Sequence, residues 1–338
     1  MGQNWSSLAQ EIINGYEITS EQALSILQSD DDELLDIMQA AFQIRKEHFG
    51  KKVKLNMIIN AKSGLCSEDC GYCSQSSISE APIEKYTWLT KEKILEGAQE
   101  AIQRKAGTYC IVSSGRRPSD KEIDHVVDAV KEIRETTDLK ICCCLGFLDE
   151  NHASKLAEAG VDRYNHNLNT SKENYDSICS THTYEDRLQT VENVSMAGLS
   201  PCSGAIFGMG ESDEEIVQIA FSLKILKADS IPCNFLNAIP GTPLEGRSEL
   251  NPRKCLKILA MMRFVNPKTE IRISGGREVN LRSLQSVGLY AANSIFVGDY
   301  LTTMGQEPTR DWAMIQDLGF EIEECAHHEE ADIAAAHA

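Results

Sequence analysis

Two patterns of apolar and polar positions divide this chain. In residues 1–50 the apolar positions recur at helical intervals, after a capping-box spacing at Thr19 and Gln22 and again after Asp30–Asp32. Gly50 ends this stretch, as glycine often ends a helix. From residue 53 onwards, short apolar runs alternate with longer amphipathic segments. Residues 1–50 are therefore predicted to form an N-terminal helical extension.

The short apolar runs have the length of buried strands. They are residues 54–60, 108–114, 139–145, 161–168, 200–207, 231–237, 270–274 and 294–298. The segments between them open with helix caps such as Ser119 with Glu122 and Ser212 with Glu215. Eight strand–helix units over about 250 residues are typical of a (β/α)₈ TIM-type barrel, so residues 51–320 are predicted to form this α/β fold. A doubly wound open sheet is the alternative, because strand count alone does not prove closure.

The end of the chain, residues 321–338, has a different composition and reads EIEECAHHEEADIAAAHA. Such a charged, alanine-rich stretch is predicted to be a weakly ordered acidic tail. Its His327–His328 pair could bind a metal, but a solvated tail is the simpler interpretation.

Composition limits the partners. The formal net charge of −18 would repel phosphates, so no nucleic-acid partner is expected. The chain lacks an apolar run long enough to span a bilayer, and its polar N-terminus does not have the plan of a signal peptide. Gly2 and Ser6 fit only the short, unspecific myristoylation pattern. A cytoplasmic location is expected, where the 12 cysteines would serve metal binding or thiol chemistry rather than disulfides.

Three of these cysteines lie in the loop after the first predicted strand. Cys66, Cys70 and Cys73 have the spacing C-x₃-C-x₂-C, in the part of a barrel that forms the catalytic face. Soft sulfur ligands select iron–sulfur clusters, zinc or copper(I). Zinc would need a fourth ligand nearby, and no His or Cys follows until Cys110. A 4Fe–4S cluster held by three cysteines would leave one iron open to a ligand that is not protein.

The loop, with the aromatic Tyr72 before its last cysteine, resembles the motif of the radical S-adenosylmethionine (SAM) superfamily. The resemblance implies that SAM chelates the open iron. It also implies that one electron from the cluster cleaves SAM into methionine and a 5′-deoxyadenosyl radical. Breaking an unactivated C–H bond is beyond acid–base groups, so the cofactor would carry the chemistry.

Four further candidates lie in four different predicted strands: Cys110, Cys142, Cys202 and Arg272. Inward side chains from different barrel strands meet near the axis, so these four could surround a second metal site. Spacing alone slightly favours the alternative, in which the cysteines are small buried apolar side chains. Cys144 would point the same way as Cys142, because side chains alternate along a strand, and is therefore a rival ligand.

Ordered motifs from about residue 50 to residue 305 resemble one branch of the superfamily, the sulfurtransferases that convert dethiobiotin to biotin. These motifs are CSEDCGYCSQSS, YNHNLNTS (164–171), CSGAIFGMGE (202–211), NFLNAIPGTPL (234–244), IRISGGRE (271–278) and ANSIFVGDYLTT (292–303). The resemblance implies that Cys110, Cys142 and Cys202 bind a 2Fe–2S cluster, with Arg272 as an unusual fourth ligand. It implies hydrogen abstraction at C9 and C6 of dethiobiotin and donation of the sulfur by this second cluster.

The resemblance also assigns contacts to the substrate and to SAM. Asn167 and Asn234 match residues at the ureido ring. An amide side chain can accept a hydrogen bond from the N–H groups of this ring and donate one to its C=O group. Thr302 and Thr303 match a pair near the substrate carboxylate. Arg187 matches a residue that pairs with the SAM carboxylate, where a fork of donors fits.

Two more positions, Tyr72 and Asn169, are assigned to SAM. Asn169 departs from the family, since many members have Asp there at the SAM ribose; Asn can accept from a hydroxyl but carries no charge. The resemblance further implies a homodimer, a low-potential electron donor such as flavodoxin or ferredoxin, and iron–sulfur assembly proteins. The alternatives are another radical enzyme and a non-enzymatic iron–sulfur or zinc protein. Lipoyl synthase would need a second C-x₄-C-x₅-C motif, which the sequence lacks.

Overall fold

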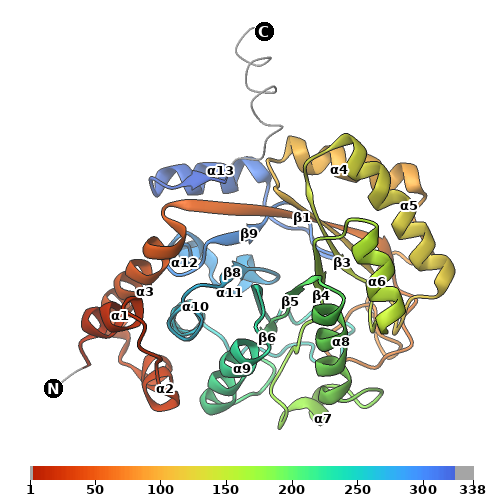
Figure 1. Cartoon of the computed structure of the whole chain (residues 1–338). Helices are drawn as coiled ribbons and strands as arrows, with labels where there is room; N and C mark the ends of the chain where they lie inside the picture. The colour runs from red at the N-terminus through yellow and green to blue at the C-terminus, as the bar shows by residue number, and fades with distance from the viewer. Residues whose placement is uncertain (1–2, 324–338) are drawn as a thin grey trace, which may run out of the picture.

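The computed structural model describes residues 3–323, in which parallel strands close into a ring (Figure 1). The strands of the ring are β1 (Lys52–Lys62), β2 (Thr108–Ser113), β3 (Lys140–Cys144), β4 (Arg163–Asn165), β5 (Ser200–Cys202), β6 (Ala205–Phe207), β7 (Ser230–Phe235), β8 (Glu270–Ile273) and β9 (Ser294–Phe296). Closure follows from β1, which pairs with both β2 and β9. Because β5 and β6 share one position beside β7, the ring has eight positions. The predicted (β/α)₈ barrel is confirmed, and the open sheet is wrong.

Helices surround the ring on its outside (Figure 1). They are α4 (Lys91–Gln103), α5 (Asp120–Thr136), α6 (Glu150–Glu158), α7 (Tyr175–Ile178), α8 (Tyr184–Met196), α9 (Asp213–Ile225), α10 (Pro252–Val265), α11 (Arg277–Asn280), η2 (Arg282–Leu284), α12 (Gln285–Gly288) and α13 (Pro308–Asp317). The capping boxes predicted from Ser119 with Glu122 and from Ser212 with Glu215 open α5 and α9. These caps satisfy backbone N–H groups that would otherwise lack partners where each helix begins.

One predicted strand, residues 200–207, is interrupted between β5 and β6. The cause is a close approach of backbone: a Cβ at Gly204 would lie 2.0 Å from the carbonyl oxygen of Pro232 in β7. Only glycine fits there. The N–H of Gly204 donates to Oδ1 of Asn167 at 3.0 Å, so the break also holds a predicted substrate contact in place.

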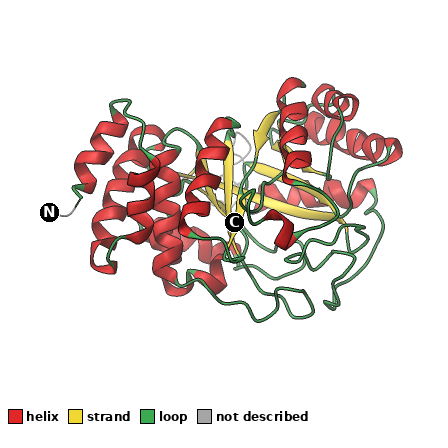
Figure 2. Cartoon of the chain, turned by 90° about the horizontal axis from the view of Figure 1, so that it is seen from below, coloured by secondary structure: helices red, strands yellow, loops and turns green. Residues whose placement is uncertain are grey.

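The N-terminal helices pack against one side of the barrel. They are α1 (Trp5–Ile13), α2 (Ser20–Gln28), η1 (Asp31–Glu33) and α3 (Leu34–Phe49), and Figure 2 shows them side by side at one end of the molecule. Both α2 and α3 contact α10, whose residues from Cys255 to Val265 are all buried. Arg45 of α3 is buried as well and donates to the backbone carbonyls of Gly50, Lys52 and Ala292. This side chain therefore ties the helices to the barrel.

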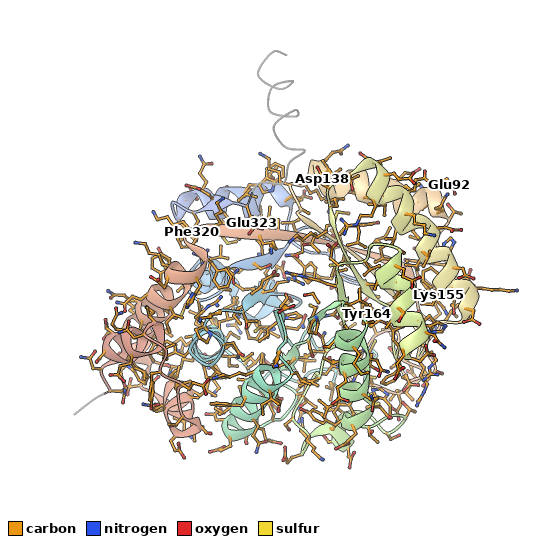
Figure 3. All side chains as sticks on the ribbon, in the orientation of Figure 1. Glu92, Asp138, Lys155, Tyr164, Phe320 and Glu323 are labelled. Carbon is orange, nitrogen blue, oxygen red and sulfur yellow. The ribbon has the colours of Figure 1, made fainter. Side chains whose placement is uncertain are left out.

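A tenth strand, β10 (Glu321–Ile322), pairs with Lys52 and Val53 of β1. Phe320, just before it, stacks on Phe42 at 5.6 Å between ring centroids, and Figure 3 labels Phe320 at this edge of the barrel. The weakly ordered tail was expected to begin at residue 321, and these contacts move that boundary. The rest of the predicted tail, including His327 and His328, lies outside the described residues.

Within residues 3–323, helices long and apolar enough to cross a membrane are absent.

Replacing Arg45 tests its role as the link between α3 and the barrel. Arg45→Ala would remove a fully buried side chain and leave the carbonyls of Gly50, Lys52 and the buried Ala292 without this donor, and we expect it to lower the free energy of unfolding by about 2–4 kcal/mol. Urea denaturation measures the loss. The matched control is Arg253→Ala, which removes a half-exposed ion pair with Asp31 and should change little. Equal losses in the two variants would contradict the role assigned to Arg45.

Candidate active site

The loops at the carboxyl ends of the strands surround a cavity of about 390 Å³ that reaches into the barrel. All but one of the predicted site residues line it: Cys66, Cys70, Tyr72, Cys73, Cys110, Cys142, Asn167, Asn169, Arg187, Asn234, Arg272, Thr302 and Thr303. The exception is Cys202, whose Sγ lies directly behind the wall, 4.0 Å from Nη1 of Arg272. The fold therefore brings together residues that are spread over most of the chain.

The loop with the three cysteines is held by backbone hydrogen bonds. Ser63 and Tyr86 exchange a pair of bonds where the chain leaves β1. The N–H of Cys73 donates to the carbonyl of Cys70, which closes a tight turn, and Gly71 donates to the carbonyl of Ile178 at 2.9 Å. These bonds fix the loop against the segment that follows α7.

The thiols of this loop influence one another. Burial raises the pKa of Cys73 to about 11, and the neighbouring thiol of Cys66 contributes in the same direction. The pKa of Cys70 is raised by its hydrogen bond with Cys179, and burial adds to the effect. Thiols this close cannot all be thiolates unless a cation is bound among them. The donor set fits an iron–sulfur cluster, which supplies that positive charge.

A second group of thiols lies deeper, on the strands. Cys110 of β2 and Cys142 of β3 are register partners, and Cys202 lies at the end of β5. The hydrogen bond with Cys110 raises the pKa of Cys142, and the hydrogen bond with Cys142 raises the pKa of Cys202. The three sulfurs therefore face one another. Their neighbour Arg272 distinguishes this group from cysteines that pack as small apolar side chains, because burying a guanidinium among apolar groups is costly.

Arg272 is held on one side by hydrogen bonds. Its Nη2 donates to Glu270 and, at 2.9 Å, to Oγ of Ser230, and its Nε donates to Oγ of Ser294 at 3.3 Å. For Nη1, the sulfur of Cys202 at 4.0 Å is the one hydrogen-bond partner found among the described residues. The remaining nitrogen is thus directed at the thiols, as a ligand or as a cation that offsets their charge.

Glu270 lies at the centre of a buried ion network. It binds Arg272, Arg163 at 2.8 Å and Lys54 at 3.1 Å. Burial alone would raise the pKa of this carboxyl, but the three cations outweigh burial and hold the pKa well below its usual value. Glu270 therefore stays ionised beneath the deeper thiols and gives three largely buried cations a shared negative partner.

The side chains of the two cysteines that follow Cys142, Cys143 and Cys144, point in different directions, as expected from the alternation along a strand. Cys144 lines the cavity, and burial raises its pKa to about 12. Cys143 is fully buried in the main hydrophobic core. Cys144 remains within the site, while Cys143 is outside it.

Arg187 of α8 is a buried cation at the upper part of the cavity. Its Nε donates to Oη of Tyr175, its Nη1 donates to the carbonyl of Asn167 at 3.0 Å, and its Nη2 lies 2.9 Å from Nε2 of His182. Among the described residues, no carboxylate pairs with it. A buried guanidinium that lacks an anionic partner favours an anionic ligand.

The predicted SAM and substrate contacts are already positioned by local bonds. Nδ2 of Asn169 donates to Oη of Tyr72 at 2.6 Å, so the two residues assigned to SAM hold each other. Asn234 bonds to the backbone of Ala205 and Gly275 through both ends of its amide. Asn167 uses its Oδ1 for Gly204, as described, and its Nδ2 has no partner within residues 3–323.

The threonine pair lies in the loop after β9. Oγ1 of Thr302 is 2.7 Å from Oγ of Ser74, next to Cys73, so this loop meets the cysteine loop at the cavity. The carbonyl of Thr303 accepts from the N–H of Tyr300 at 2.9 Å. The pair is therefore placed beside the loop that carries the first group of thiols.

Sequence reasoning missed three residues near these groups: Glu270, Cys179 and His182. The spacing C-x₂-H of Cys179 and His182 was a signal for metal binding, but it gains meaning only from Cys70 on the cysteine loop, whose sulfur lies 3.8 Å from that of Cys179. For Glu270 the sequence carries no comparable signal, because its partners lie on other strands.

Comparisons with known proteins show the family of this chain. The Radical SAM superfamily model matches residues 62–223, and the Biotin and Thiamin Synthesis associated domain matches residues 232–321. Biotin synthase of Bacillus cereus (strain AH187) is 72% identical over 323 residues, which cover 96% of this chain and 97% of that protein. Biotin synthase of Bacillus cytotoxicus is 73% identical over the same shares.

Solved structures share the fold at much lower identity. Methylornithine synthase aligns with a TM-score of 0.83 at 20% identity, over 97% of this chain and 99% of that one. The FeFe-hydrogenase maturase of Carboxydothermus hydrogenoformans aligns with a TM-score of 0.82 at 17% identity, over 96% and 80%. At such identities the likeness concerns the fold alone, and it agrees with the closed barrel.

The ion network predicts a large and pH-dependent effect of Glu270→Gln. The buried Arg272 and the largely buried Arg163 would lose their carboxylate partner, and Lys54 would keep only Glu323, so we expect the free energy of unfolding at pH 7 to fall by about 3–5 kcal/mol. The carboxylate stabilises the fold above its unfolded pKa of 4.5, and this contribution is lost as the pH falls toward the lower folded pKa. Urea unfolding of the metal-free, reduced chain should therefore show a deficit that shrinks below about pH 4.5. Glu96→Gln, in an exposed pair with Lys93, is the control and should show neither effect.

Proposed function

Because the chain belongs to the biotin synthase family of radical SAM enzymes, we propose that its cavity is where sulfur is inserted into dethiobiotin to form biotin. The chain is an enzyme, a radical SAM sulfurtransferase, and its cofactors are a 4Fe–4S cluster, a 2Fe–2S cluster and SAM. One observation carries the proposal. The three loop thiols and two of the three strand thiols line one cavity, and Cys202 lies beside Arg272 at its wall, so a substrate between the two groups would be within reach of both.

We propose that the loop thiols and the strand thiols each hold a different cluster. Cys66, Cys70 and Cys73 would hold the 4Fe–4S cluster at the mouth, and Cys110, Cys142, Cys202 and Arg272 would hold the 2Fe–2S cluster below. When bound, the first cluster with SAM supplies a radical that removes hydrogen from unactivated carbon, and the second supplies sulfur. Since Glu270 favours the charged guanidinium, Arg272 also offsets the negative charge of the thiolates.

Arg187 is proposed to bind the carboxylate of SAM. Its three nitrogens are fixed by Tyr175, Asn167 and His182, so the fork is oriented before a ligand arrives. An ionised carboxylate would give this buried cation the counter-charge that no described residue provides. Tyr72 and Asn169, bonded to each other, would form the adjacent wall for SAM.

Asn167 and Asn234 are proposed to bind the ureido ring of dethiobiotin. Bonds to Gly204 and Gly275 fix the two amides, so their remaining donor and acceptor positions have a defined direction. Thr302 and Thr303 would bind the substrate carboxylate near the mouth. The apolar side chains of Phe296 and Ile58 line the cavity and pack with Cys110 and Cys142, which suits the aliphatic part of the substrate and limits water.

The proposal extends to partners. The reaction requires an electron donor, for which we propose a low-potential flavodoxin or ferredoxin. Iron–sulfur assembly proteins, a homodimeric state and a cytoplasmic location are proposed from the family. The net charge of −18 supports the absence of a nucleic-acid partner.

The strand cysteines provide the decisive test of the second cluster. After anaerobic reconstitution, Cys110→Ala, Cys142→Ala and Cys202→Ala should each lose most biotin formation and the 2Fe–2S absorbance, while the 4Fe–4S signal remains. Iron and sulfide analysis gives the stoichiometry. Cys143→Ala is the matched control, because this neighbour of Cys142 points into the core and should keep both signals. Intact biotin formation in all three variants, or zinc without sulfide in the wild type, would overturn the proposal.

Arg187→Lys tests the SAM contact. The lysine keeps the charge but loses the fork, so we expect the affinity for SAM to fall about 10- to 100-fold while the 4Fe–4S absorbance is retained. Equilibrium dialysis of the reconstituted protein measures this change. Arg117→Lys, at an exposed arginine that does not line the cavity, serves as control, and an equal affinity in both variants would contradict the assignment.

A further inference from the structure

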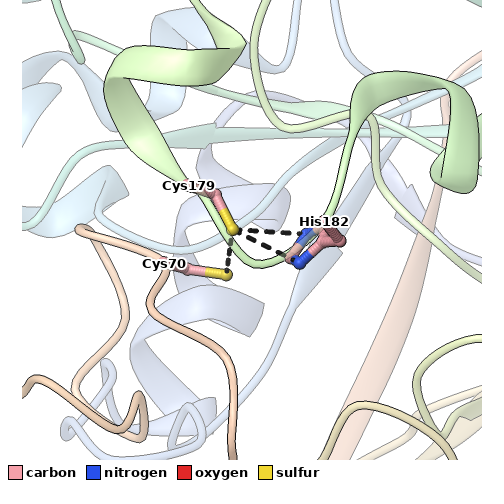
Figure 4. A group of neighbouring side chains, drawn as sticks. All are labelled: Cys70, Cys179 and His182. Carbon is pink, nitrogen blue, oxygen red and sulfur yellow. Dashed lines mark hydrogen bonds between the residues drawn. The ribbon is translucent and has the colours of Figure 1, made fainter.

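Cys179 and His182, on the segment between α7 and α8, meet Cys70 of the cysteine loop (Figure 4). The sulfurs of Cys70 and Cys179 are 3.8 Å apart, and Sγ of Cys179 is 3.3 Å from Nδ1 and 3.7 Å from Nε2 of His182. One ligand atom from each residue lies within 4.8 Å of the others, and all three residues are buried. The proposed reaction uses neither Cys179 nor His182.

The spacing of these atoms suits a tetrahedral metal ion. Zinc with bonds of about 2.3 Å to sulfur and about 2.0–2.1 Å to nitrogen has edges of about 3.8 Å between two sulfurs and about 3.6 Å between sulfur and nitrogen. The observed distances are 3.8 Å between the sulfurs and 3.7 Å from Cys179 to Nε2. These two edges already match the ion, and the third, between Cys70 and His182, is within 4.8 Å, so it is the one edge that would have to adjust for the three side chains to share one ion.

The histidine ring is oriented for binding through Nε2. A guanidinium can only donate hydrogen bonds, so Nε2 must accept from Nη2 of Arg187 and is therefore unprotonated. The ring proton of the neutral histidine is then on Nδ1. Nδ1 then donates to the carboxylate of Glu68, which Arg116 and Thr181 hold in place. A carboxylate behind a histidine in this way fixes the ring and its tautomer at metal sites.

An ion at Nε2 would displace the contact from Arg187. This costs one hydrogen bond, because Nε and Nη1 of Arg187 keep their bonds to Tyr175 and Asn167. The two thiols would lose their protons on binding, as metal-bound thiols do. Their negative charge would in turn offset the approach of a divalent cation to Arg187.

We propose that Cys70, Cys179 and His182 bind one thiophilic divalent cation, such as Zn²⁺, when the chain lacks its 4Fe–4S cluster. The metal site itself rests on geometry alone. The second part of the inference rests on the proposed function: because Cys70 is also a cluster ligand there, the ion and the 4Fe–4S cluster exclude each other. Zinc would then hold the loop in a state that cannot assemble the cluster.

A background of Cys66→Ala with Cys73→Ala isolates this site in the full-length chain. The background removes the other two thiols of the loop and leaves Cys70, Cys179 and His182. Zn²⁺ is titrated into this anaerobic, reduced and iron-free protein against a chromophoric chelator. Adding Cys179→Ala or His182→Ala should weaken binding about 100-fold or more, whereas Cys233→Ala, a buried thiol in the core, should not. X-ray absorption should find two sulfur neighbours and at least one nitrogen neighbour.

Unchanged zinc affinity after both Cys179→Ala and His182→Ala would overturn the site, as would a shell of sulfur without nitrogen. Cys179→Ser, which keeps the size of the side chain, replaces Cys179→Ala if thermal unfolding shows that the alanine variant does not fold. None of these readouts involves biotin formation, so their outcome is separate from that of the proposed function. For the exclusion, zinc-loaded wild type should fail to develop 4Fe–4S absorbance. Cys179→Ala should develop it at the same zinc concentration, and equal inhibition of both would refute the exclusion.

Discussion

Closure of the parallel ring is the constraint on which the rest of the structure depends. β1 pairs with β2 on one edge and with β9 on the other, so all carboxyl ends of the strands meet at one mouth. Inward side chains from β2, β3, β5 and β8 then converge on the axis, which brings the deeper thiols to Arg272. An open sheet with the same elements would leave β2 and β8 far apart. The cysteine loop depends on the same closure, because the loop after β9 contacts it through Ser74.

Buried cations have different partners at two levels of the barrel: a lower level around Glu270, beneath the strand thiols, and an upper level around Arg187, near the mouth. At the lower level, Lys54, Arg163 and Arg272 share the carboxylate of Glu270, so the protein supplies its own counter-charge. At the upper level, Arg187 is equally shielded from water, but it is bonded to a phenol, a carbonyl and an imidazole rather than a carboxylate. Each cation of the lower network therefore has a carboxylate partner within the protein, whereas Arg187 gains a counter-charge from an anion. This asymmetry agrees with a cavity that receives its small molecules from the mouth.

The sequence predicted the ring well, because strands buried on both faces are continuous apolar runs that stand out from amphipathic helices. It could not show the break before Gly204, which arises from the approach of Pro232 on another strand. The loop thiols followed from spacing alone, whereas the strand cysteines needed the family resemblance to be read together. Cys179 was missed because its partner, Cys70, is 109 positions away in the sequence. The sequence around a residue does not reveal a role that depends on contacts with distant parts of the chain. Glu270 was missed for the same reason, because Lys54 and Arg163 lie on other strands.

Cys70 connects the two uses of this region. Its thiol lies near that of Cys73 within the loop, and it also contacts Cys179 on the segment before α8. Ligand sets that share a sulfur cannot be satisfied together, so whichever metal occupies the region decides the state of the whole loop. Gly71 strengthens this coupling, since its bond to the carbonyl of Ile178 fixes the loop against the segment that carries Cys179. The same rigidity that would prepare the loop for the proposed cluster would therefore also prepare the proposed competing site.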